Sequence, residues 1–246
     1  MPNTPYLDKS VQWRLQTGNL AFHELRYREV AKAILESGLA TDVISKIGSG
    51  KEADVYFGHL GSRRVAIKVY RYYRTSHQGM GPVKAEGLGQ VASREFELLS
   101  YAYVGGVSVP EPIERDEQML SMAYLGTQEG PAPRLKDVRL EAPGPFLDEV
   151  LRAVERLAAA GIVHTDLSPF NILVHEGHPW LIDFADALRV DRLGQSPWER
   201  LTLAQGALER GLGSLSRHFA RYGLQLEPQP LVRRIVDRLD RFGLMR

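Results

Sequence analysis

The 246-residue chain predicts an α+β fold of two lobes. Short β-rich segments bounded by glycine dominate residues 43–70, whereas apolar residues at helical spacing dominate the second half of the chain. A compact polar motif, HTDLSPFN at residues 164–171, lies within this second half. We therefore expect an N-terminal lobe built on an antiparallel sheet with one long helix, followed by a small, mostly helical C-terminal lobe.

The composition excludes several classes of protein. Cysteine is absent, which excludes disulfides, thiolate zinc sites and a cysteine nucleophile. The net charge of +1 creates no global field that favours nucleic acid. No segment approaches the roughly 20 apolar residues of a membrane span, and the N-terminus lacks a basic start followed by an apolar core. We expect a cytoplasmic protein.

The expected elements follow the chain in order. Apolar residues predict a helix over Phe22–Ser37 that ends at Gly38, and the stretch from Arg71 to Gly89 has no apolar period and is interpreted as a mobile loop. A short helix is expected near Leu135–Leu140, and a strong one runs from Leu147 to the stop at Gly161. Two further stripes predict C-terminal helices through Leu201, Leu208, Leu212, Leu215, Phe219 and Tyr222, and through Leu231, Ile235, Leu239 and Phe242. The expected limits are 1–40 for an N-terminal helical extension, 41–125 for the first lobe and 126–246 for the second.

A glycine-rich turn separates two β-rich segments at GSGKEADV. Glycines allow backbone N–H groups to approach phosphate without a Cβ in the way. Ser45 and Glu52 exclude a Walker A loop, because that motif requires glycine and a hydroxyl residue at their positions. The pattern fits the loop that covers ATP phosphates in protein kinases, and the residues expected to do so are Gly48, Ser49, Gly50, Lys51 and Val55.

Residues 65–68 read VAIK, which places Lys68 inside an apolar strand. Such a lysine is costly to bury unless it is paired, so we expect it to bind the α- and β-phosphates of ATP and a glutamate of the next helix. That helix is expected over Gln90–Tyr103. Glu95 lies on its apolar stripe, whereas Glu97 is rotated by about 200°. We therefore predict a Lys68–Glu95 ion pair.

The segment MLSMAYLG predicts a strand that ends in a hinge, where Met122, Ala123 and Leu125 would contact adenine. The apolar residues Ala66, Leu173 and Ile182 complete the predicted nucleotide site. His175 and His178 flank a tight turn, which is more typical of a solvated hairpin than of a metal site.

The motif HTDLSPFN is followed by a second aspartate at the end of an apolar run. Phosphoryl transfer needs a carboxylate to receive the proton of the nucleophile and oxygen ligands to hold metal ions on the phosphates. We predict Asp166 as the base, and Asn171 and Asp183 as ligands of Mg²⁺ or Mn²⁺. Lys68 and these three side chains are expected to act on one ATP molecule.

The chain resembles the RIO family of atypical serine/threonine protein kinases. Similar blocks are GSGKEADV, AIKVY, SREFELL, GVSVPEPI, HTDLSPFN and LIDFADA. The 44 residues before the loop favour the subfamily without a winged-helix domain. The resemblance implies a two-lobed kinase-like fold without peptide-substrate subdomains, ATP and Mg²⁺ as cofactors, and a kinase or ATPase activity. It also implies an aspartyl-phosphate on Asp183 and a role in maturation of the small ribosomal subunit.

Two other functions are left open. The Asp and Asn spacing is shared with small-molecule kinases of the aminoglycoside or choline type. A nucleotide-responsive ribosome- or RNA-binding module is the other, because Arg210, Arg217 and Arg221 are spaced for one helix face. Thr75 and Ser76 are candidate sites of self-phosphorylation.

Overall fold

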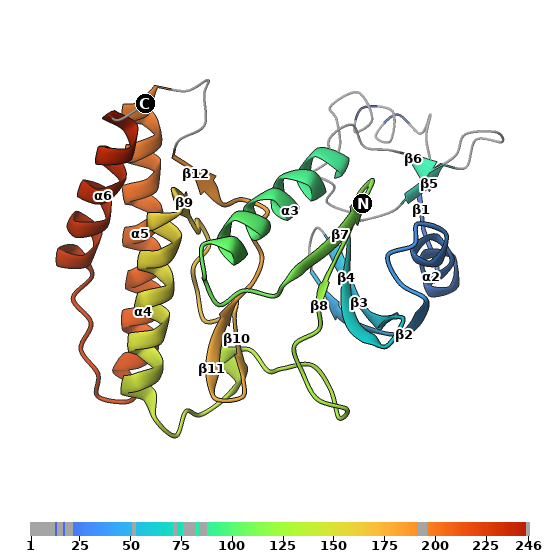
Figure 1. The fold of residues 1–246 in the computed structure, drawn as a ribbon, viewed down its shortest axis with the longest axis horizontal. Coiled ribbons are helices and arrows are strands. Elements are labelled where there is room, and N and C mark those ends of the chain that lie inside the picture. Colours follow the sequence, from blue (N-terminus) through green and yellow to red (C-terminus); the bar gives the residue numbers. More distant parts are fainter. Residues whose placement is uncertain are drawn as a thin grey trace. The chain divides into compact units, whose positions relative to one another are not determined.

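The computed structural model describes residues 13, 17, 22–50, 53–70, 73–75, 82–83, 88–190 and 196–244. The chain divides into two compact units, one of Met1–Phe96 with Pro112–Tyr124 and the other of Glu97–Glu111 with Leu125–Arg246. The first contains an antiparallel sheet and the second is mainly helical, which confirms the predicted α+β class (Figure 1). No helix within the described residues is both long enough and apolar enough to cross a membrane.

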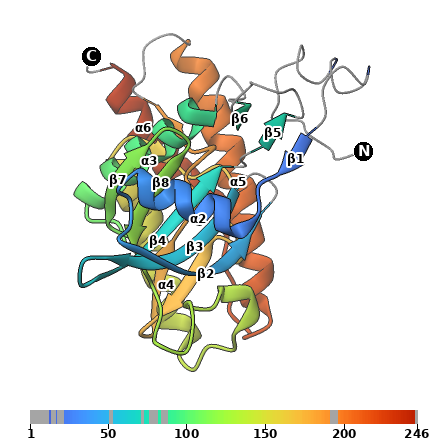
Figure 2. The same ribbon diagram turned by 90° about the vertical axis from the view of Figure 1, so that its right-hand side faces the viewer.

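The first unit is organised around a five-stranded antiparallel sheet of order β2-β3-β4-β8-β7. The strands are β2 (Asp42–Ser49), β3 (Ala53–Leu60), β4 (Arg63–Tyr70), β7 (Pro112–Asp116) and β8 (Met119–Ala123). Helix α2 (Tyr27–Glu36) lies across one face of this sheet (Figure 2). Val30 and Ile34 of α2 pack there with Val65, Ile67 and Val69 of β4 in one buried cluster. Because side chains alternate along a strand, the residues between these in β4 point to the other face.

The N-terminal helix prediction was wrong for its first residues. Phe22–Glu24 form strand β1, which pairs with β5 (Tyr73–Thr75), and β5 in turn pairs with β6 (Pro82–Val83). The helix begins only at Tyr27. The interpretation of Arg71–Gly89 as loop was also wrong for these two short strands and for the start of helix α3 (Leu88–Val104). Strands of two or three residues are too short to produce a period in the sequence. Whether such a segment forms a strand therefore depends on the segment with which it pairs.

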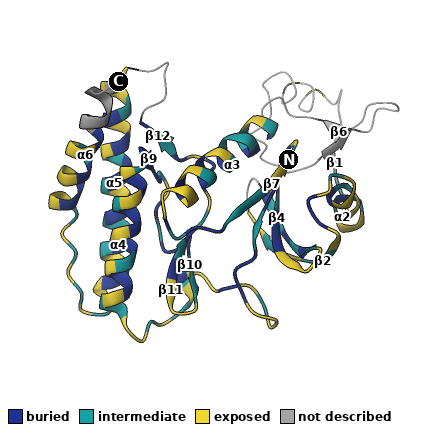
Figure 3. Ribbon diagram, viewed as in Figure 1, coloured by how far each residue is buried: buried dark blue, intermediate teal, exposed yellow. Residues whose placement is uncertain are grey.

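The second unit contains three long helices, α4 (Pro143–Ala159), α5 (Pro197–Ala220) and α6 (Pro228–Leu244). They lie side by side in Figure 1, and Figure 3 shows buried residues along α4 and α5. The predicted stripes are confirmed for Leu201, Leu208, Leu212, Leu215 and Phe219 of α5 and for Leu231, Ile235 and Leu239 of α6, which are buried. Tyr222, expected on the first stripe, lies in the turn after α5 and is half-buried. The side chain of Phe242 lies outside the described residues.

Short strands and a 3₁₀ turn, η1 (Leu135–Asp137), complete the second unit. Strand β9 (Ile162–Val163) pairs with β12 (Leu188–Arg189), and β10 (Ile172–His175) forms a hairpin with β11 (His178–Leu181). The HTDLSPFN motif therefore connects β9 to β10, and Asp183 follows β11. The short predicted helix near Leu135–Leu140 is only this 3₁₀ turn.

Candidate active site

Lys68 and Glu95 form the predicted ion pair within the first unit. Lys68 Nζ lies 2.7 Å from Glu95 Oε1, and the two side chains are 12% and 3% exposed. The hydroxyl of Tyr70 donates a hydrogen bond to Glu95 Oε2, and Lys68 Nζ lies 5.1 Å from the centre of the Tyr70 ring. The buried carboxylate is thus satisfied at both oxygens, as a charge removed from water requires.

Tyr70 was not predicted as a site residue. The signal was present, because a residue two positions after Lys68 in a strand shares its face of the sheet. Glu97, the rejected candidate, is exposed and pairs instead with Arg189, whose Nη1 lies 3.1 Å from Glu97 Oε1. Arg189 also lies over the ring of Tyr101, with its Cζ 4.1 Å from the ring centre.

Strand register places several predicted nucleotide-binding residues on one face of the sheet. Val55 pairs with Lys68, and Ala66 pairs with Met122. Directly paired residues point to the same face, so all four lie on the face opposite α2. Gly48 pairs with Val55 and joins this row. Ala123 pairs with Val65, so its side chain belongs to the other face.

The phosphate-loop candidate is closed at its ends by short hydrogen bonds. The Gly50 N–H donates to the Ala53 carbonyl at 2.8 Å, and Ser49 Oγ donates to Asp54 Oδ1 at 2.6 Å. Lys46 Nζ lies 3.7 Å from the other oxygen of Asp54. Lys51 lies outside the described residues. The ends of the loop are therefore held by β2 and β3 themselves.

Tyr124 ends the first unit at the predicted hinge. Its N–H donates to the Arg64 carbonyl, and its ring packs against Phe57 with the ring centres 4.3 Å apart. Burial raises the pKa of the Tyr124 hydroxyl above its ordinary value of 10.0, and the nearby Arg64 guanidinium partly opposes this. Leu125 belongs to the second unit, and its carbonyl accepts a hydrogen bond from the Ala132 N–H.

Asn171 and Asp166 form the centre of the second unit's candidate site. Asn171 is 8% exposed, and its Nδ2 donates to the Asp166 carboxylate at 2.8 Å and to the Asp166 carbonyl at 2.9 Å. Both amide hydrogens are thereby used on Asp166, which leaves Asn171 Oδ1 as an oxygen donor. The five-residue spacing of the motif is the length that lets the amide reach back to the aspartate.

Asp183 is exposed and adopts a φ of 69°, in the left-handed region that non-glycine residues seldom occupy. Its neighbours hold this conformation. The Ile182 N–H donates to the Asn171 carbonyl at 3.0 Å, and His164 Nε2 donates to the Ile182 carbonyl at 2.9 Å. Phe184 is fully buried with its ring edge-on to His164. Leu173 and Ile182 are both half-buried in this unit.

The segment after Asp183 is tied back to the start of the motif. Thr165 Oγ1 donates to the Asp186 carbonyl at 2.9 Å, and Leu188 pairs with Val163 in the β9–β12 ladder. These bonds fix both ends of the Asp183 turn relative to Asp166.

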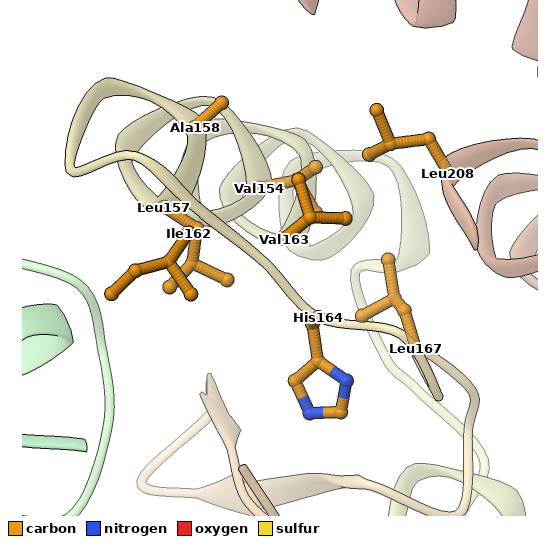
Figure 4. Close-up of a pocket in the computed structure, with 8 residues that line it drawn as sticks. All are labelled: Val154, Leu157, Ala158, Ile162, Val163, His164, Leu167 and Leu208. Atoms are coloured by element: carbon orange, nitrogen blue, oxygen red, sulfur yellow. The ribbon is translucent and has the colours of Figure 1, made fainter. Parts of the chain in front are cut away.

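Helix α5 packs against the HTDLSPFN motif where Gly211 meets Leu167. A Cβ placed on Gly211 would lie 2.8 Å from the Leu167 Cβ, so the glycine permits this close approach. A cavity of about 10 Å³ remains beside Leu167, lined mostly by apolar side chains (Figure 4). It has room for about one water molecule, so it is a packing gap and not a ligand site.

Several other residues singled out in the sequence belong to other elements of the fold. His175 and His178 end the two strands of the β10–β11 hairpin, and His178 Nδ1 donates to Glu149. Arg210 and Arg217 are exposed on α5, but Arg221 donates to the Val138 carbonyl at 2.8 Å and so clamps a neighbouring segment. Thr75 ends β5, and its side chain and Ser76 lie outside the described residues.

The metal-ligand candidates fit Mg²⁺ by the chemistry of their donors. Asn171 Oδ1 and the Asp183 carboxylate are hard oxygen donors, and Mg²⁺ is usually held by one or two protein oxygens together with substrate phosphates and water. Among the described residues there is no group of three or more His, Cys, Asp or Glu that could form an all-protein metal site. The set therefore suits a metal that arrives with phosphates.

Comparison with known proteins places this geometry in a family. The RIO domain model matches residues 54–230. The RIO-type serine/threonine-protein kinase Rio1 of Haloferax volcanii is 32% identical over 158 residues, covering 58% of this chain and 54% of that protein. The serine/threonine-protein kinase RIO1 of Caenorhabditis elegans is 32% identical over 186 residues, covering 68% of this chain and 36% of that protein. The chain thus spans about half the length of the first relative and about a third of the second.

A solved structure shares the fold. The Rio2 kinase–ADP/Mg²⁺–phosphoaspartate complex from Chaetomium thermophilum superposes with a TM-score of 0.65 at 20% identity, covering 95% of this chain and 78% of that one. Residues 54–230, which the RIO domain model matches, span most of β3, all of β4 and α3, and the HTDLSPFN motif. The chain therefore belongs to the RIO family of atypical kinases.

Proposed function

We propose that the chain is an ATP-dependent serine/threonine kinase or ATPase of the RIO type. The observation that best supports this is the Asp166–Asn171 contact, in which one amide nitrogen bonds both the carboxylate and the carbonyl of the aspartate. It holds a carboxylate that can accept a proton beside an amide oxygen that can ligate a metal. The curated relatives are named serine/threonine-protein kinases, which supports the same activity.

Each residue has a specific role in this proposal. Lys68, held by Glu95, would orient the α- and β-phosphates, and the backbone of Gly48–Lys51 would cover them. Asn171 and Asp183 would hold Mg²⁺, which neutralises charge on the phosphates when bound. Apolar contacts with the adenine ring of ATP would come from the side chains of Val55, Ala66, Met122, Leu173 and Ile182. Ala123 would contribute only its backbone.

The transfer step uses a hydroxyl of the acceptor. The hydroxyl oxygen attacks the γ-phosphorus, its proton passes to the Asp166 carboxylate, and the bond between the γ-phosphorus and the bridging oxygen breaks to release ADP. Atoms and charge balance without any further reactant. Because Asp166 accepts the proton and does not hold ATP in this proposal, its removal should leave binding of ATP but not turnover.

An aspartyl-phosphate on Asp183 is the second part of the proposal. The Chaetomium thermophilum Rio2 complex contains a phosphoaspartate with ADP and Mg²⁺. In this chain the exposed carboxylate of Asp183 could attack the γ-phosphorus in place of a hydroxyl, and water would then hydrolyse the acyl phosphate. That sequence produces an ATPase and would suit a nucleotide switch in ribosome maturation.

The test is incubation of the purified chain with γ-labelled ATP and Mg²⁺. Labile label, bound as an aspartyl-phosphate and released as inorganic phosphate in acid, is expected on Asp183, and acid-stable label is expected on serine or threonine of an acceptor. Both Asp166→Ala and Asp183→Ala should reduce ATP turnover by at least about 10³-fold with an unchanged circular dichroism spectrum. Normal ATP consumption by both variants would contradict the proposal.

A further inference from the structure

Phe170 is a large apolar side chain that the fold does not bury. It directly precedes Asn171 in the HTDLSPFN motif and is 54% exposed. The Lys136 ammonium lies 5.1 Å from the centre of its ring. A cation beside an exposed aromatic ring contributes only about 0.5–1 kcal/mol, so stability does not explain an exposed phenylalanine here.

The backbone holds this pair in place. The Lys136 N–H donates to the Pro169 carbonyl at 3.1 Å, one residue before Phe170. Arg134 forms an isolated β-bridge with Leu173, two residues after Asn171. The segment Arg134–Lys136 is therefore attached by its backbone on both sides of the Phe170–Asn171 dipeptide, which holds residue 136 next to Phe170.

The same segment carries excess positive charge. Lys136 pairs with Asp137 at 2.5 Å, but exposed ion pairs are weak and exchange readily. Arg134 and Arg139 are exposed and form no ion pair within the described part of the chain. Residues 134–139 thus carry a net charge of +2 next to the Pro169–Leu173 segment, which contains the proposed metal ligand Asn171.

We propose that Arg134, Lys136, Arg139 and Phe170 form an acceptor-docking patch for an acidic protein segment that carries the phosphorylated serine or threonine. This inference rests on the proposed function, whose acceptor class it specifies. The cations complement acidic side chains, and the Phe170 face packs against the backbone and apolar atoms of the segment. Three cations are too few for tight binding of RNA, which relies on many phosphate contacts.

Steady-state kinetics with three matched peptides test the patch. Each peptide carries one serine, flanked by aspartates, by lysines or by alanines. The wild type should phosphorylate the aspartate peptide with a kcat/KM at least about tenfold above that of the lysine peptide. Lys136→Glu should reduce this ratio about tenfold, mainly through KM, because it reverses one charge at the docking patch.

A matched control separates local contact from general charge. Arg233 on α6 is exposed and forms no ion pair with the rest of the described chain. Arg233→Glu changes net charge as Lys136→Glu does, so it should leave the peptide ratio unchanged. Phe170→Leu keeps the apolar character but not the ring, and it should raise the KM of all three peptides by a similar factor.

Peptide binding, measured by fluorescence anisotropy without ATP, distinguishes failure of the patch from failure of the proposed function. Equal kcat/KM for the three peptides, or an equal loss in the Lys136→Glu and Arg233→Glu variants, would overturn the patch and leave the kinase assignment standing. Charge-selective binding of the peptides without any phosphate transfer or ATP turnover would support the patch and overturn the proposed kinase or ATPase function. Binding of a single-stranded RNA oligonucleotide that Lys136→Glu abolishes, with no peptide binding, would also overturn the proposed acidic protein partner.

Discussion

At the scale of single residues, the Glu95 carboxylate is the group whose burial depends most on its partners. Glu95 is 2% exposed, and Lys68 and Tyr70 each bind one oxygen of its carboxylate. The helical stripe predicted that Glu95 faces inward, because residues three and four apart share a face of a helix. The partner on the strand could be predicted only in part, since the sequence indicated Lys68 but not Tyr70.

Separate replacement of the two glutamates of α3 by glutamine tests whether Glu95 is the buried partner of Lys68. Glu95→Gln should lower the free energy of unfolding by about 3 kcal/mol, because it leaves the Lys68 charge buried without its counter-ion. It should also reduce ATP turnover. Glu97→Gln, at an exposed pair with Arg189, should cost less than about 1 kcal/mol. Urea denaturation and ATPase assays measure both, and equal losses would contradict the burial argument.

Gly211 shows how a residue without a side chain can position a catalytic loop. Gly211→Ala should lower the free energy of unfolding by about 1–2 kcal/mol, because its Cβ would displace Leu167. We also expect kcat to fall while KM for ATP changes little, since Leu167 adjoins Asp166. Gly213→Ala on the same helix meets only the end of Arg217 at 3.7 Å, so it should instead stabilise by about 0.5–1 kcal/mol.

Rescue distinguishes positioning from general loss of stability. In a Gly211→Ala/Leu167→Gly double variant the Cβ–Cβ clash is removed, so part of the lost kcat should return although a buried side chain has been deleted. A double variant with strictly additive losses would refute the positioning role.

At the scale of elements, the β2–β3 hairpin carries the phosphate-loop candidate, and Gly58 sets how close its strands lie. A Cβ at Gly58 would lie 2.1 Å from the Asp42 carbonyl oxygen. Because that neighbour is backbone, the strands themselves must separate to admit a side chain.

We expect Gly58→Ala to lower the free energy of unfolding by more than about 2 kcal/mol. Gly144→Ala near the start of α4 provides the control, since nothing lies within 4 Å of its Cβ position, and it should change stability by less than about 0.5 kcal/mol. Thermal denaturation of both variants measures the difference. Equal melting temperatures would show that the hairpin adjusts without cost.

Elements with a long period were predictable, and short ones were not. The 17-residue helices α3 and α4 and the 24-residue α5 each carry several turns of apolar repeat, and all three were expected. Strand β1 has three residues and was assigned to a helix. Its pairing with Tyr73–Thr75 depends on a contact about fifty residues away, which no local pattern encodes.

At the scale of the whole molecule, stability should depend on pH through His218 on α5. Burial and the positive charge of Arg221 lower the pKa of His218 below its ordinary value of 6.5. The unfolded chain therefore binds a proton at a pH where the folded chain does not. Stability from neutral His218 is fully present above pH 6.5 and is lost as the pH falls through the lowered pKa of the folded state.

Replacement of this histidine should flatten the pH dependence. The free energy of unfolding of the wild type should fall between pH 7.5 and pH 5.5, and His218→Gln should show a smaller fall over the same range. Urea denaturation at both values measures the change. Identical slopes for the two proteins would assign the pH dependence to other groups.

For the molecule as a whole, the α+β class, the order of the motifs and the family could be predicted from residue types alone, because each depends on such types at short, constant spacings. The sequence also identified the inward glutamate of α3. Three contacts became known only from the folded chain: Tyr70 binds that glutamate, the Asn171 amide binds Asp166, and Arg221 binds the Val138 carbonyl. Such hydrogen bonds and close packing depend on where distant segments meet, and the periodicity of a sequence contains no information about that.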